Sequence, residues 1–164
     1  MRKKGYFKKR DFRGDSVYGR VDVERFVNYL MSEGDKTSAE KVFYGALAKV
    51  KATTKEEPIK VFERALENSI PLLEVVSKRI GGANYQIPRE VRAERKFFLA
   101  THWIIAAARA KKGKPMADRL AEEITLASKN EGTAIKKKQD MHRMAEANRA
   151  FASLMRRPRP TPAA

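Results

Sequence analysis

Cysteine is absent from the 164 residues, and histidine occurs only twice, as His102 and His142. Without cysteine the chain forms no disulfide, no thiolate metal site and no cysteine nucleophile. The two histidines lack the spacing and neighbouring carboxylates of common metal sites. The sequence also has neither GxxxxGK[ST] nor GxGxxG, and no nucleophile has a base beside it. These absences argue against an enzyme and predict that no cofactor is bound.

Long hydrophobic runs are missing as well. No apolar stretch is long enough to cross a membrane, and the N-terminus lacks the apolar segment of a signal peptide. We therefore expect a soluble, cytoplasmic protein with no membrane partner. The length of 164 residues is sufficient for one hydrophobic core, which favours a single domain.

Acidic residues are few, with 20 Asp and Glu against 36 Lys and Arg, so the net charge is +16 and the pI about 10.2. The excess is concentrated at the ends: residues 1–13 carry seven basic residues and one acid, and residues 136–164 carry eight and two. Two charged ends therefore flank a nearly neutral centre. This distribution favours a polyanionic partner.

Apolar residues at helical spacing predict six helices. The first helix is expected to begin at about Val23. The second and third follow capping boxes formed by Thr37 with Glu40 and by Thr54 with Glu57. The fourth is expected over residues 91–112, the fifth from Met116, and the sixth from Thr133 to Met155. The predicted class is mainly α, with a six-helix bundle-like body and a protruding two-stranded β-hairpin between helices three and four. The predicted organisation is a basic arm (1–13), one helical domain (14–155) with the hairpin at about 72–89, and a disordered basic, proline-rich tail (156–164).

The hairpin is predicted from "KRIGGANYQIP" (78–88), where Gly81-Gly82 supplies a two-residue turn. That turn pairs residue 74 with 89, 76 with 87 and 78 with 85 on one face, and 75 with 88, 77 with 86 and 79 with 84 on the other. The second face is mainly polar, and the tip is basic. The candidate contacts for a polyanion are Lys78, Arg79, Asn84, Tyr85 and Gln86. A hairpin that is merely solvated is the alternative interpretation.

Further candidate contacts lie on two helices and in the basic arm. Arg92, Arg95, His102 and Arg109 form one stripe of the fourth helix, expected opposite the side of Phe98, Trp103 and Ile105. Lys136, Lys137 and Lys138 occupy the first turn of the sixth helix, where the helix dipole disfavours cations unless a phosphate binds. The remaining candidates are Arg2, Lys3, Lys4, Lys8, Lys9, Arg10, Arg13 and Arg143. Such charges often do no more than keep a face solvated.

Four segments carry a resemblance to a known family: "AEKVFYGAL" (39–47), "GGANYQIP" (81–88), "KKGKPMADRLAEEI" (111–124) and "HRMAEANRAFA" (142–152). In this order they resemble the bacterial type of ribosomal protein seven of the small subunit, over roughly residues 14–155. The resemblance implies a six-helix body with a hairpin between helices three and four. It also implies RNA contacts in the basic arm, at Lys78 and Arg79, and at Arg92 and Arg95. At His102 the family more often has Arg before the Trp.

The resemblance further implies a structural role in translation. The family binds the 3′ major domain of small-subunit ribosomal RNA, starts assembly of the subunit head, and lies at the subunit interface near exit-site transfer RNA and the messenger RNA path. Its expected neighbours are small-subunit proteins nine, eleven and thirteen. The alternative from another class is an architectural DNA-binding protein, whose ribbon would enter the minor groove with Ile80 as a wedge.

Overall fold

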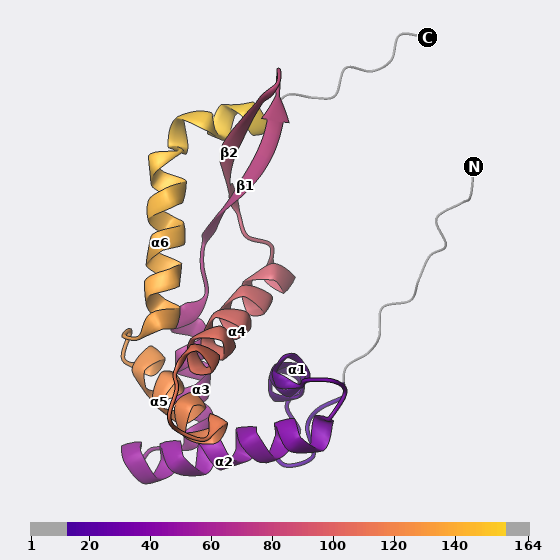
Figure 1. Cartoon of the computed structure of the whole chain (residues 1–164), viewed down its shortest axis with the longest axis vertical. Coiled ribbons are helices and arrows are strands. Elements are labelled where there is room, and N and C mark those ends of the chain that lie inside the picture. The colour runs from indigo at the N-terminus through magenta and orange to yellow at the C-terminus, as the bar shows by residue number, and fades with distance from the viewer. Residues whose placement is uncertain (1–12, 157–164) are drawn as a thin grey trace, which may run out of the picture.

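The computed structural model of the chain describes residues 13–156 (Figure 1). In chain order the elements are α1 (Val21–Leu30), α2 (Lys36–Thr54), α3 (Pro58–Ser69), β1 (Leu73–Ile80), β2 (Ala83–Glu90), α4 (Ala93–Ala110), α5 (Met116–Ser128), α6 (Thr133–Ala147) and the 3₁₀ helix η1 (Arg149–Arg156). Six α-helices with a hairpin between α3 and α4 confirm the predicted fold class. Most of the predicted arm and tail lies outside the described residues, so their predicted boundaries stay predictions.

Helices α1 to α5 form a body around one hydrophobic core. Phe26, Phe43 and Phe62, from α1, α2 and α3, are fully buried and pack against one another with ring centroids 5.0–5.3 Å apart. Phe62 meets the other two rings edge to face, and such packing adds to the free energy gained by burial. Ile104 of α4 and Ile124 of α5 are fully buried in the same cluster. The apolar faces that predicted the helices therefore meet in one core.

The hairpin has the predicted register, with Glu74 opposite Arg89, Lys78 opposite Tyr85 and Arg79 opposite Asn84. Gly81 and Gly82 form the turn with φ values of 55° and 90°. Positive φ at both central residues is the requirement of a type I′ turn, whose twist matches that of the strands. The glycine pair thus sets the register of the whole ribbon.

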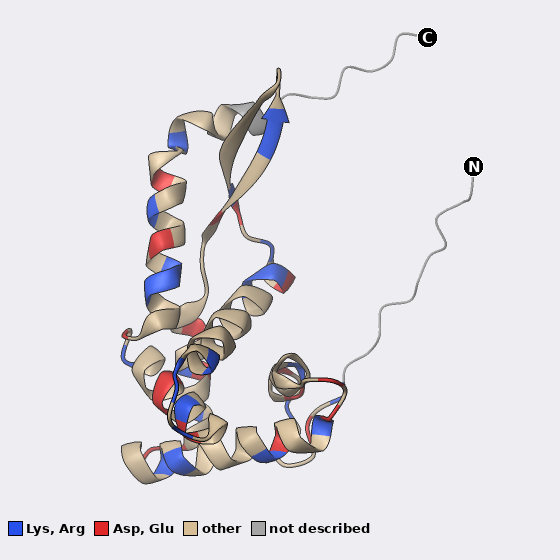
Figure 2. Ribbon diagram, viewed as in Figure 1, with Lys and Arg blue, Asp and Glu red and all other residues tan. Residues whose placement is uncertain are grey.

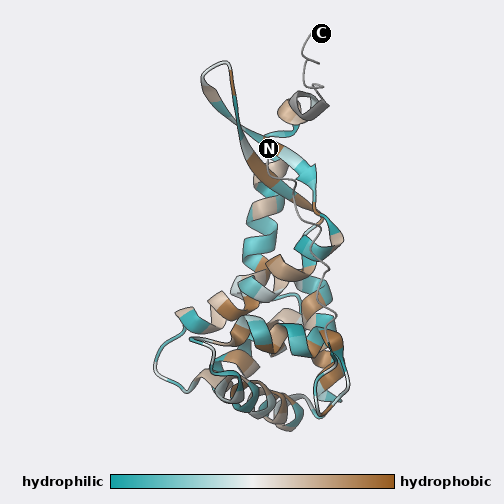
Figure 3. Cartoon of the chain, turned by 90° about the vertical axis from the view of Figure 1, so that its right-hand side faces the viewer, coloured by the Kyte–Doolittle hydropathy of each residue, from teal (hydrophilic) through white to brown (hydrophobic). Residues whose placement is uncertain are grey.

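The ribbon and α6 project together from the body, as Figure 1 shows, and η1 crosses from the end of α6 to the ribbon. Hydrophobic residues run through the helices of the body and continue into the ribbon (Figure 3). The prediction that the sixth helix reaches Met155 was wrong, because α6 ends at Ala147 and Asn148 follows as its C-cap. The chain turns there, which brings the Phe151 ring to 5.4 Å from the Tyr85 ring, centroid to centroid.

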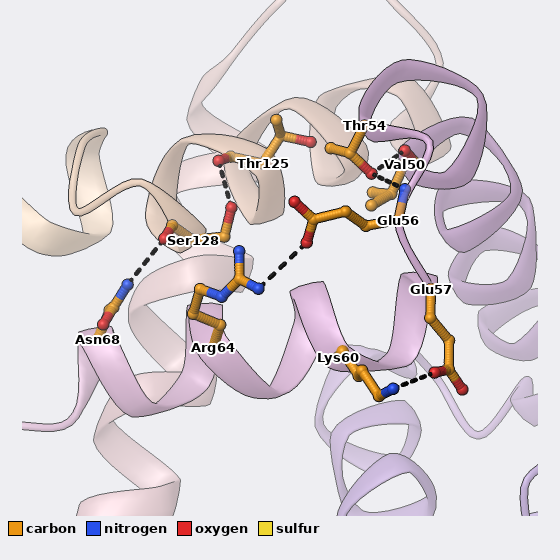
Figure 4. Close-up of polar contacts among 9 residues, drawn as sticks. All are labelled: Val50, Thr54, Glu56, Glu57, Lys60, Arg64, Asn68, Thr125 and Ser128. Carbon is orange, nitrogen blue, oxygen red and sulfur yellow. Dashed lines mark hydrogen bonds and ion pairs between the residues drawn. The ribbon is translucent and has the colours of Figure 1, made fainter.

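Both predicted capping boxes were also wrong. Helix α2 begins two residues earlier than expected, with Asp35 in place of Thr37 as its N-cap, because the Asp35 carboxylate accepts hydrogen bonds from the Ser38 backbone N–H and hydroxyl. Thr54 still belongs to α2, and its hydroxyl donates to the Val50 carbonyl at 2.8 Å (Figure 4). Helix α3 instead begins with Pro58 at its first position, where the missing N–H of proline costs nothing.

Asn68 connects three helices at the ends of α3 and α5. Its side-chain amide donates to the Ala127 and Ser128 carbonyls at the end of α5, both at 3.0 Å, and Figure 4 shows the second of these bonds. Its own carbonyl accepts a hydrogen bond of 2.6 Å from the Lys138 Nζ of α6. Carbonyls at a helix end have no partner within the helix. Asn68 and Lys138 therefore satisfy such groups while joining α3, α5 and α6.

We expect Asn68→Ala to lower the free energy of unfolding by about 1–2 kcal/mol, because the Ser128 carbonyl loses its donor and the Ala127 carbonyl keeps the Asn130 N–H but loses the amide. The measurement is urea denaturation followed by circular dichroism. Asn28→Ala is the matched control: Asn28 lies half-buried on α1, and the same change there alters helix propensity without removing this contact. Equal effects of the two substitutions would show that Asn68 does not join the helices.

Candidate nucleic-acid interface

Figure 2 shows Lys and Arg on the ribbon, at the start of α4, in the body and along α6. Among the predicted contacts, those with exposed side chains are Arg13, Lys78, Arg79, Asn84, Gln86, Arg92, Arg95, His102, Arg109, Lys136, Lys137 and Arg143. Tyr85 and Lys138 are half-buried. The predicted contacts from Arg2 to Arg10 lie outside the described residues. The described candidates thus fall into two groups, one on the ribbon and α4 and one at the start of α6. Arg13 and Arg143 lie outside both groups.

The base of the ribbon is attached to α4 through the buried carboxylate of Glu74. Its Oε1 lies 2.6 Å from an Arg89 guanidinium nitrogen, and its Oε2 lies 3.3 Å from Arg95 Nε. Charge-assisted bonds of this kind are stronger than neutral ones and fix the direction of the guanidinium. Glu74 therefore links β1, β2 and α4, and it places Arg95 beside the ribbon.

The two faces of the ribbon differ in what they contact. The face of Glu74 and Ile87 is buried, and Tyr85 on the same face meets Phe151 of η1. On the opposite face Ser77, Arg79, Asn84 and Gln86 are all exposed. Alternation along the strands thus turns one face to α6 and η1 and leaves the other, polar face open. The open face presents a cation together with hydrogen-bonding amides.

The exposed stripe of α4 carries aromatic rings as well as charge. The Phe98 ring stacks on His102 with centroids 4.0 Å apart, and the Arg95 guanidinium lies 4.9 Å from the Phe98 centroid. The expectation that Phe98 lies opposite the stripe was therefore wrong. Residues four apart share a helix face, so the spacing of 98 and 102 already placed the two rings together.

Arg109 lies at the far end of the stripe. It donates to the Leu30 carbonyl of α1 at 3.1 Å and borders a pocket that also contains Glu33 and Asp35. Nearby carboxylates weaken the attraction of a cation for phosphate. Arg109 is consequently less suited to a phosphate contact than Arg92, which is exposed at the start of the helix.

The start of α6 is capped by the protein itself. The fully buried Glu123 of α5 accepts a hydrogen bond of 3.0 Å from the Ala134 N–H, and its other oxygen lies 3.0 Å from Lys111 Nζ in an ion pair. A carboxylate therefore already occupies the anion position that the sequence suggested for phosphate. Lys136 and Lys137 are exposed there.

Lys138 differs from its two neighbours. Burial lowers the pKa of its ammonium group, which donates to the Asn68 carbonyl. Its role as an RNA contact stays a prediction, while the structure gives it a capping role. Arg143, further along α6, is exposed and pairs with Asp140 on the same helix at 2.9 Å.

His142 connects α6 to the start of the ribbon. Its Nε2 accepts a hydrogen bond of 3.0 Å from the Leu72 N–H. Burial, with a smaller contribution from the charge of Lys138, lowers the pKa of His142 below its ordinary value of 6.5. An imidazole must be neutral at this nitrogen to accept the bond. His142 thus supports the ribbon in its uncharged form.

The loop after the N-terminal arm is organised around the buried Asp15. Its carboxylate accepts hydrogen bonds from the backbone N–H groups of residues 17, 18 and 20 and from the Tyr44 hydroxyl. Burial raises the pKa of Asp15, but the four hydrogen bonds outweigh it and the net shift is downward. Burial and the bond to Asp15 together raise the pKa of Tyr44 to about 12. This loop fixes the point at which the basic arm leaves the body.

Three contributors to the interface were missed by the sequence reasoning: Glu74, Tyr29 and Phe151. Tyr29 of α1 meets the His102 ring at 5.2 Å and the Phe98 ring at 5.6 Å, centroid to centroid. The predicted pairing of Glu74 with Arg89 was the one signal in the sequence for the role of Glu74. Nothing in the sequence indicates the contacts of Tyr29 and Phe151, because both join segments distant along the chain.

Within residues 13–156 no group of three or more potential ligands could hold a metal ion. No helix in that range is long and apolar enough to cross a membrane. A helical body with an exposed polar ribbon and an aromatic, cationic helix face is typical of the nucleic-acid-binding class of proteins.

Comparison with known proteins identifies the class more closely. The profile of the family described as ribosomal protein S7p/S5e matches residues 2–149. Relatives named small ribosomal subunit protein uS7 include those of Thermotoga petrophila (55% identical, 84% of this chain and 89% of the relative) and Thermotoga maritima (54%, 88% and 93%). That of onion yellows phytoplasma is 48% identical over 93% of this chain and 97% of the relative.

The chain belongs to the ribosomal protein S7p/S5e family. It is a structural, non-enzymatic constituent of the small ribosomal subunit, and its context is RNA binding and translation within a ribonucleoprotein. Its location is the ribosome, which in bacteria lies in the cytoplasm. The resemblance noted from the sequence is confirmed.

The lowered pKa of His142 predicts a dependence of stability on pH. Since the folded state holds this imidazole neutral, its contribution is complete above the unfolded pKa of about 6.5 and is lost as the pH falls below it. We expect His142→Gln, whose amide oxygen can still accept from Leu72, to reduce the fall in melting temperature between about pH 7 and about pH 5. His102→Gln removes the exposed histidine and serves as control. An unchanged pH profile in His142→Gln would contradict a neutral, bonded imidazole.

Proposed function

We propose that the chain binds the 3′ major domain of small-subunit ribosomal RNA directly and starts assembly of the subunit head. The observation that carries the proposal is the attachment of the ribbon base to the start of α4 by Glu74, which fixes the position of the ribbon relative to the α4 stripe. Membership of a small-subunit protein family supports it.

The chemistry of the two surfaces suits structured RNA. Sequence-specific RNA recognition uses unpaired bases and 2′-hydroxyls, while phosphate contacts fix the position of the protein. The amides of Asn84 and Gln86 provide donors and acceptors, and the charges of Arg79 and Arg92 suit phosphate. Ile80, the candidate wedge for DNA, is half-buried and pairs with Ala83, which gives the DNA-binding alternative no support.

The proposal divides the cations by function. Those of the arm, α4 and the start of α6 anchor the protein, whereas the ribbon tip lies near exit-site transfer RNA and the messenger RNA path at the subunit interface. Small-subunit proteins nine, eleven and thirteen are the proposed neighbours. The ribbon tip carries only two cations, Lys78 and Arg79. We therefore expect the tip to contribute a minor share of the free energy of RNA binding.

A first test separates the lysines of α6. Replacing Lys136 and Lys137 by Gln should flatten the log–log dependence of RNA affinity on salt by about 1.4–1.8, since each lost phosphate contact removes about 0.7–0.9. Lys138→Gln should leave the slope unchanged and lower the melting temperature. The measurement is filter binding of a 3′ major domain transcript at several salt concentrations. A slope unaffected by the double substitution would place both lysines outside the RNA contact.

A second test concerns the ribbon. Replacing Lys78–Tyr85 by a short glycine-containing turn removes two cations and leaves the body core intact, so RNA affinity should fall by only about 1–3 kcal/mol. Subunits that carry the deletion should assemble a head but retain less exit-site transfer RNA. Both are measured in one strain, by subunit profiles and by transfer RNA occupancy. Failure of head assembly with normal occupancy in the surviving subunits would show that the ribbon is an anchor.

A further inference from the structure

A column of stacked side chains runs along the exposed stripe of α4. It begins with the Arg95 guanidinium, 4.9 Å from the Phe98 centroid, and continues to His102, whose ring centroid lies 4.0 Å from that of Phe98 with 30° between the planes. Tyr29 packs at 81° to Phe98 and 69° to His102, beside both rings. The order along the helix is therefore guanidinium, phenyl and imidazole.

The next position of the column is occupied by Ala106, which is exposed and extends no further than its methyl group. Positions 95, 98, 102 and 106 follow the spacing of three and four residues that defines one helix face. Helical side chains lean toward the N-terminus, so His102 leans over Phe98 and away from Ala106. His102 is nevertheless exposed. Its free ring face is therefore the one above Ala106.

The column ends there and leaves room for one more planar ring. Arg109 is the next long side chain of the stripe, about 10 Å along the helix axis from His102 and about 4.5 Å from Ala106. Its bond to the Leu30 carbonyl holds its guanidinium against the end of α1. The gap above Ala106 is thus bounded by an imidazole face on one side and by a tethered guanidinium on the other.

We propose that this gap is a stacking site for one unpaired RNA base, which rests on His102 above Ala106 and extends the column. The inference depends on the proposed RNA-binding function and adds to it a contact that carries no charge. Proteins commonly hold unpaired bases on aromatic side chains, and such stacking tolerates any base identity. Arg92 lies about 21 Å nearer the start of the same helix, where it suits a phosphate further along the same RNA strand.

The test fills the gap without altering charge. In Ala106→Leu the affinity for a 3′ major domain transcript should fall about 5- to 150-fold, the effect of losing one stacked base. The salt slope should stay unchanged because no phosphate contact is lost. Ala52→Leu, at an exposed alanine of α2, is the matched control and should bind like the wild-type chain.

Substitutions of His102 test the stacking face itself. His102→Ala should lose affinity as Ala106→Leu does, whereas His102→Phe should retain it, since phenyl preserves a stacking surface without a hydrogen-bonding nitrogen. Circular dichroism melting of each variant verifies folding. Wild-type chain that fails to bind the transcript would overturn the proposed function. Wild-type binding with unaltered affinity in Ala106→Leu, or equal losses in His102→Ala and His102→Phe, would overturn the stacking site alone.

Discussion

The buried carboxylate of Glu74 is the contact on which the arrangement of this protein depends. A two-stranded ribbon is marginally stable by itself, so its direction must be set by the body. Glu74 sets it by pairing with Arg89 across the ribbon and with Arg95 on α4. Because a buried charge without its partner is strongly destabilising, the three residues form one unit. The relation between the two candidate RNA surfaces follows from that unit.

A second set of contacts supports the ribbon from the side of α6. The neutral imidazole of His142 accepts a bond from Leu72, and the Lys138 ammonium caps α3 through Asn68. Where the chain turns after α6, Phe151 reaches Tyr85. These contacts turn one face of the ribbon toward α6 and η1. The polar face is consequently the one that remains available to a partner.

Positive charge in this protein therefore has two uses. Arg89, Arg95 and Lys138 meet protein acceptors and hold elements together, whereas Arg79 and Lys136 are exposed. For a structural constituent of a ribonucleoprotein this division is physically reasonable, because phosphate contacts position a protein only if the groups that make them are themselves held in place. Net charge alone indicates the kind of partner and says nothing of this division.

The sequence by itself determined the helices, the hairpin and its register. Apolar periodicity reports which side of a helix is buried, and the Gly81-Gly82 turn permits one pairing, so local rules were sufficient. The same rules place Arg95 and His102 on one stripe. They also place Phe98 there, because it lies four residues before His102. The helix starts were predicted less well. Asp35 and Thr37 are both residue types that cap helices, and the cap is Asp35. Thr54 was predicted to cap α3, but its hydroxyl bonds to the Val50 carbonyl within α2.

Only the tertiary structure decided which charges are committed to the protein itself. Lys136 and Lys138 belong to one run of three lysines, yet Lys136 is exposed and Lys138 is bound to Asn68, a residue 70 positions away. The start of α6 resembled a phosphate site until Glu123 of α5 was found to cap it. Such assignments depend on which distant group lies within hydrogen-bonding distance, and that is set by the packing of helices against one another, which no local pattern contains.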